Sequence, residues 1–77
     1  MSRRVERKYI DNWIAENSPN GMAKLALSAG VSAGLIGKAR EGYAPRKAGS
    51  RLMICRVLGV AEDVLFPILP DGEEQAS

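Results

Sequence analysis

The sequence contains no histidine and only one cysteine, Cys55. A histidine base, a Cys–His dyad and a zinc finger are therefore excluded, and an internal disulfide cannot form. Because Cys55 lies in an apolar run, we expect a small buried thiol in a reducing compartment rather than a nucleophile. No apolar run approaches the roughly 18 residues of a membrane span. The basic start "MSRRVERKYI" lacks the apolar segment of a signal peptide, so a cytoplasmic protein is expected.

The elements of common catalytic sites are also missing. No serine is paired with a base, and no metal-ligand set is present. Lys38 follows a glycine in "GLIGKAREG", but the spacing and the preceding strand of a phosphate-binding loop are absent. We therefore expect no enzyme, no cofactor and no small-molecule substrate.

Acidic residues are scarce in the first three quarters of the chain. Residues 1–60 hold all 11 lysines and arginines against four acidic residues, a net charge of +7. Residues 61–77 hold five acidic residues and no base. Small basic domains often bind phosphate backbones, although charge alone fits a solvated surface equally well. The 77 residues allow one domain with a small core.

Apolar residues recur at spacings of three and four, which predicts helices rather than strands. Ser2 and Ser32 are candidate N-caps, and Gly30 and Gly59 suit helix ends. The predicted fold is all-α, with a domain over residues 1–70 and a disordered acidic tail over 71–77. The expected helices span residues 3–17, 22–29, 33–41 and 48–58, with a short fifth over 61–66.

The predicted core joins the second and third helices. Its inward residues are expected to be Leu25, Ala26, Ala29, Val31, Ile36 and Ala39, with Val64, Leu65 and Phe66 closing it from the C-terminal side. Trp13 lies on the apolar stripe of the first helix. That position favours a core residue over a stacking platform.

Three segments carry a resemblance to a known family: "LALSAGVSAGLIGKAREG", then Pro45, then "LGVAEDVLF". Over about residues 10–66, the chain resembles the phage-repressor-like (XRE/Cro type) helix-turn-helix regulators. The resemblance implies a compact lambda-repressor-like domain of four to five helices. It also implies a transcription regulator of the phage or mobile-element type, a repressor that binds duplex DNA as a homodimer, with the third helix in the major groove.

The resemblance also assigns residues to roles. Met22 and Ala23 would approach phosphates through free N–H groups at a helix start. Arg3 and Arg4 would form a flexible arm, and Ile68 and Leu69 either a dimer contact or a cover over the first helix. The residues expected to face bases are Ser32, Ala33, Gly34, Gly37 and Lys38, and further phosphate ligands are Lys24, Arg40, Tyr43, Arg46 and Lys47.

The expected reading face is nearly bare. Only Ser32 and Lys38 carry polar side chains there, whereas the family often has polar residues at the places of Met22 and Ala33. Gly34 and Gly37 each cost a helix roughly 1 kcal/mol relative to alanine. They either allow close approach to DNA or permit close helix packing, unless DNA reading has been lost. The alternative functions are a protein-interaction module of the same fold and a nonspecific DNA binder.

Overall fold

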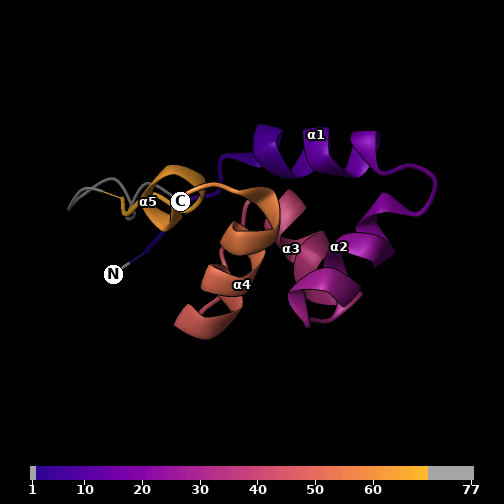
Figure 1. Cartoon of the computed structure of the whole chain (residues 1–77). Helices are drawn as coiled ribbons and strands as arrows, with labels where there is room; N and C mark the ends of the chain where they lie inside the picture. The colour runs from indigo at the N-terminus through magenta and orange to yellow at the C-terminus, as the bar shows by residue number, and fades with distance from the viewer. Residues whose placement is uncertain (1, 70–77) are drawn as a thin grey trace.

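The computed structural model describes residues 2–69, and the expected tail over 71–77 lies outside this range. Within it the chain is all-helical, with no β-strand. Helix α1 lies across the other helices, and α5 lies at one end of the molecule (Figure 1). Among the described residues, no helix has the length and apolar character needed to cross a membrane. The helices are α1 (Arg7–Glu16), α2 (Gly21–Ala29), α3 (Ala33–Arg40), α4 (Ala48–Leu58) and α5 (Glu62–Leu65).

The core forms where α2 packs against α1, α3 and α4. The expected inward residues of α2 and α3 are confirmed as buried, whereas Val31 is half-buried. Trp13 packs against the core as predicted. Leu65 and Phe66 close the core, but Val64 is 44% exposed, so its expected place there is wrong. The largest fully buried side chains are Ile10, Leu25, Ile36, Ile54, Leu65 and Phe66.

Short-range signals set the bounds of α2, α3 and α4. Ser32 caps α3, because its hydroxyl accepts a hydrogen bond of 3.1 Å from the Leu35 amide. Gly30 and Gly59 take left-handed conformations (φ 69° and 71°) directly after α2 and α4. These conformations suit glycine and end each helix at the expected residue.

The expected helix over residues 3–17 starts too early, because residues 2–6 are extended. Arg3 forms an antiparallel bridge with Ile68. The Glu6 amide donates a hydrogen bond of 2.9 Å to the Leu65 carbonyl, and the Leu69 amide donates one of 2.9 Å to Ser2. We call this pairing of residues 2–6 with 65–69 the end clasp. It uses backbone groups that a helix would need, so α1 begins at Arg7 and Ser2 caps nothing.

Gly21 allows α2 to start directly beneath α1. It is buried, and a Cβ built at this position would overlap the carbonyl oxygen of Ile14. Only glycine therefore lets the two backbones approach this closely.

Candidate functional site

The outward face of α3 is the first part of the candidate site. Ile36 and Ala39 are fully buried and fix the orientation of the helix. Ser32, Ala33, Gly34 and Lys38 are exposed on the other side, and Gly37 is half-exposed beside Met22. The structure thus brings together all five residues that were expected to face bases. We call Ala33, Gly34, Gly37 and Lys38 the bare face.

The glycines of the bare face have no packing role in the described chain. A Cβ at Gly34 would meet only the Ser32 hydroxyl oxygen, at 3.9 Å. A Cβ at Gly37 would make an ordinary contact of 3.4 Å with the Cε of Met22, the end of a flexible side chain. Close helix packing, one of the two initial explanations, therefore does not account for them. Their helix-propensity cost, roughly 1 kcal/mol each, is not repaid inside the molecule.

A basic concavity lies beside the bare face. It has a volume of about 900 Å³, and four cationic residues but no acidic residue line it. Lys38 belongs to both surfaces, and its ammonium nitrogen lies 5.6 Å from the centre of the exposed Tyr43 ring. Its cations attract anions, and its tyrosine ring offers an apolar surface. The lining residues are Ser2, Arg3, Leu35, Lys38, Gly42, Tyr43, Ala44, Pro45, Arg46 and Arg51.

Arg51 builds the wall of the concavity, although the sequence gave no reason to select it. Its side chain is only 13% exposed. One Nη donates to the carbonyls of Pro45 (2.7 Å) and Arg46 (2.9 Å), which fixes the loop before α4. Its Nε donates to Glu62 at 2.7 Å and so connects the loop to α5. This hydrogen bond lowers the pKa of the Glu62 carboxyl below its ordinary value.

Arg3 is part of the same wall, so the expected flexible arm is wrong for this residue. Its guanidinium donates to the Phe66 carbonyl at 2.9 Å and lies 3.8 Å from Glu62. Arg4 is more exposed and pairs with Glu6 at 2.8 Å. The end clasp also holds Ile68, which is 45% exposed, and the half-buried Leu69. These two residues therefore pair with residues 2–6, and a dimer contact there stays a prediction.

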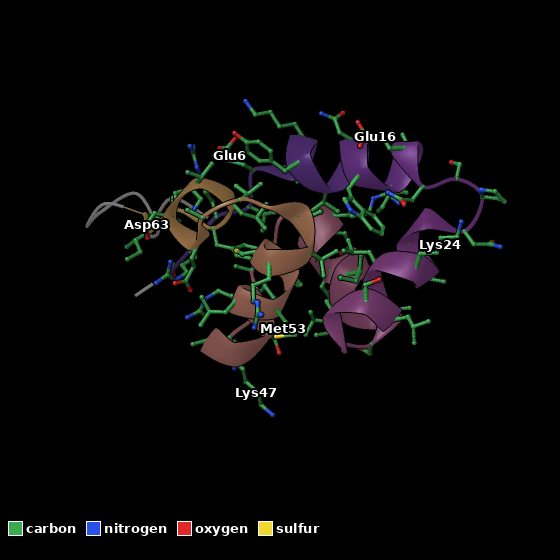
Figure 2. The ribbon with its side chains drawn as sticks, in the orientation of Figure 1. Glu6, Glu16, Lys24, Lys47, Met53 and Asp63 are labelled. Atoms are coloured by element: carbon green, nitrogen blue, oxygen red, sulfur yellow. The ribbon has the colours of Figure 1, made fainter. Side chains whose placement is uncertain are left out.

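The expected phosphate ligands occupy several sides of the molecule. Arg46 and Lys47 are exposed in the loop before α4. Lys24 is also exposed, and its ammonium donates to the Asn17 carbonyl at 3.0 Å. Figure 2 shows Lys24 and Lys47 well apart, so they cannot bind one phosphate together. Each can only contact a different part of an extended partner.

The start of α2 and the end of α3 meet beside α1. Ala23 is exposed, while Met22 is half-buried against Gly37. Arg40 turns toward α1, where its Nε lies 3.0 Å from the Asp11 carboxylate. Arg40 is therefore partly neutralised, unlike the cations of the loop before α4.

No protein-family model, curated protein or solved structure matches this chain. Its function is therefore inferred from the site itself.

Proposed function

We propose that the chain is a sequence-specific, duplex-DNA-binding transcription regulator, a repressor with a lambda-repressor-like helix-turn-helix fold. The observation that carries this proposal is the bare face of α3, where Gly34 and Gly37 leave backbone open to solvent without any packing need. Exposed glycines in a helix suit a partner that approaches the backbone closely. The adjacent basic concavity gives that partner a negative charge.

The dimensions of α3 suit the major groove of DNA. Its eight residues form a rod about 12 Å long, and the groove is about 12 Å wide. In this arrangement Ala33 contacts a thymine methyl group, and Lys38 is the main polar reader of bases. Arg46 and Lys47 then reach phosphates from the loop after α3. Shape and close backbone approach supply discrimination that the few polar side chains do not.

A protein-interaction module is the competing function, and one observation favours it. Leu27 on α2 is 84% exposed, which offers an apolar contact near the start of α3. Such a module would bind DNA no better than other basic surfaces and without sequence preference. The two functions are therefore separated by sequence selectivity.

The deciding experiment is affinity selection from a random duplex pool, followed by titration of the selected sequence at several salt concentrations. We expect a palindrome bound at least about a thousandfold more tightly than bulk DNA, which would also indicate a homodimer on DNA. An unenriched pool, with weak binding abolished by salt, would favour the interaction module or a nonspecific binder.

Charge variants test the assigned contacts. Lys38→Ala should weaken binding of the selected duplex. The double variant Arg46→Ala/Lys47→Ala should also reduce the slope of log affinity against log salt by about 2, because two fewer phosphates are neutralised. Lys8→Ala/Arg56→Ala removes the same charge from exposed positions on α1 and α4 and is the matched control. Equal slopes in the two double variants would contradict the roles of the loop.

A further inference from the structure

We propose that the acidic segment of this chain over residues 71–74 binds the basic concavity and competes there with DNA phosphates. The segment carries Asp71, Glu73 and Glu74 and follows the end clasp after two residues. The competition rests on the proposed DNA-binding function, whereas the contact itself does not.

The charges of the two parts match. Four cations line the concavity. Arg3 and Arg51 share one carboxylate, that of Glu62, at 3.8 and 2.7 Å. Lys38 and Arg46 form no salt bridge within residues 2–69. The concavity and Glu62 together therefore keep an excess of three positive charges, and three carboxylates follow the clasp.

The path of the chain delivers these carboxylates to the site. The Leu69 amide is hydrogen-bonded to the carbonyl of Ser2, and Ser2 and Arg3 both line the concavity. An extended chain covers at most about 7 Å from Leu69 to residue 71 and about 17 Å to residue 74. The acidic side chains are thus tethered within reach of the cations.

The tether makes weak ion pairs effective. Exposed pairs each change an equilibrium by a factor of about five at most. A short flexible connection, however, raises the local concentration of the acidic segment into the millimolar range. Screening limits these pairs to a Debye length of about 10 Å at 0.1 M salt, so the contact must weaken as salt rises.

Amide chemical shifts of the full chain test the contact without DNA. In Glu73→Gln/Glu74→Gln, we expect the amide signals of Lys38, Tyr43 and Arg46 to move relative to the native protein in low salt. The difference should vanish near 1 M salt, where the Debye length is about 3 Å. Unmoved signals in low salt would overturn the proposal, and shifts that depend on protein concentration would assign the segment of a second copy instead.

The matched control is Glu16→Gln/Asp63→Asn, which removes the same charge from exposed positions at opposite ends of the molecule (Figure 2). The tail variant should bind nonspecific duplex DNA at least about threefold more tightly than this control in low salt. Equal affinities would overturn the competition. If no variant binds DNA, the proposed function and the competition both fail, while the chemical shifts still decide the contact.

Discussion

Replacing the glycines of the bare face should stabilise the protein and weaken its binding to DNA. Gly34 is the second residue of α3, and Gly37 lies within the helix. Alanine at either position meets no atom closer than 3.4 Å, and the contact at that distance is the mobile end of Met22. No steric cost therefore opposes the gain in helix propensity.

The gain is up to about 1 kcal/mol at each position. In a domain of this size, about 1 kcal/mol corresponds to a rise of about 4–8 °C in Tm. On the DNA side, an added methyl group holds the backbone of α3 away from the base edges. Overpacking of a close interface typically costs about 1–3 kcal/mol, so affinity for the selected duplex should fall about tenfold or more.

Urea unfolding, followed through the fluorescence of Trp13, measures the stability change, and titration of the selected duplex measures affinity. Gly49→Ala is the control for Gly34→Ala, because Gly49 is the second residue of α4 and a Cβ there meets nothing within 4 Å. It should gain similar stability and keep full affinity. If Gly34→Ala/Gly37→Ala is more stable and binds DNA as well as the native protein, close backbone approach is refuted.

Three further predictions concern the fold. Gly21→Ala should destabilise the protein by about 2–3 kcal/mol in urea unfolding, because its Cβ overlaps the backbone of Ile14. Arg51 lowers the pKa of Glu62, so the carboxylate stabilises the fold above its ordinary pKa of 4.5, and this contribution is lost as pH falls through the lower folded value. The stability difference between native protein and Glu62→Gln should accordingly shrink in acid-range unfolding curves, and a constant difference would contradict the pairing. Burial raises the pKa of the Cys55 thiol, so a thiol reagent at neutral pH should react slowly with native protein and rapidly in urea.

The elements that sequence reasoning placed correctly are those with local signals. The cap at Ser32 and the glycines after α2 and α4 act over three or four residues, and they set the bounds of α2, α3 and α4 to within one residue. The burial of Ile36 and Ala39 follows from helical spacing alone, and this burial exposes the bare face.

The elements that were missed depend on distant partners. Val5 fits the apolar stripe of a helix, yet the end clasp holds it extended through carbonyls about sixty residues away. Arg51 resembles any other helical cation until the fold brings Glu62 and the Pro45 carbonyl to it. Local periodicity contains no information about such pairings, so the wall of the basic concavity could not be predicted.

The end clasp also has a consequence for the order of folding. The hydrogen bond from Arg3 to Phe66 closes a loop of 63 residues, and closing such a loop costs about 4 kcal/mol in chain entropy. Helices α1, α2 and α3 are near neighbours in sequence, so their contacts can form first, and the clasp closes on a chain they have already shortened. Because that last closure buries Val5 and also brings Arg3 into the concavity, a phosphate chain bound there would hold the two ends of the domain together and stabilise the whole fold.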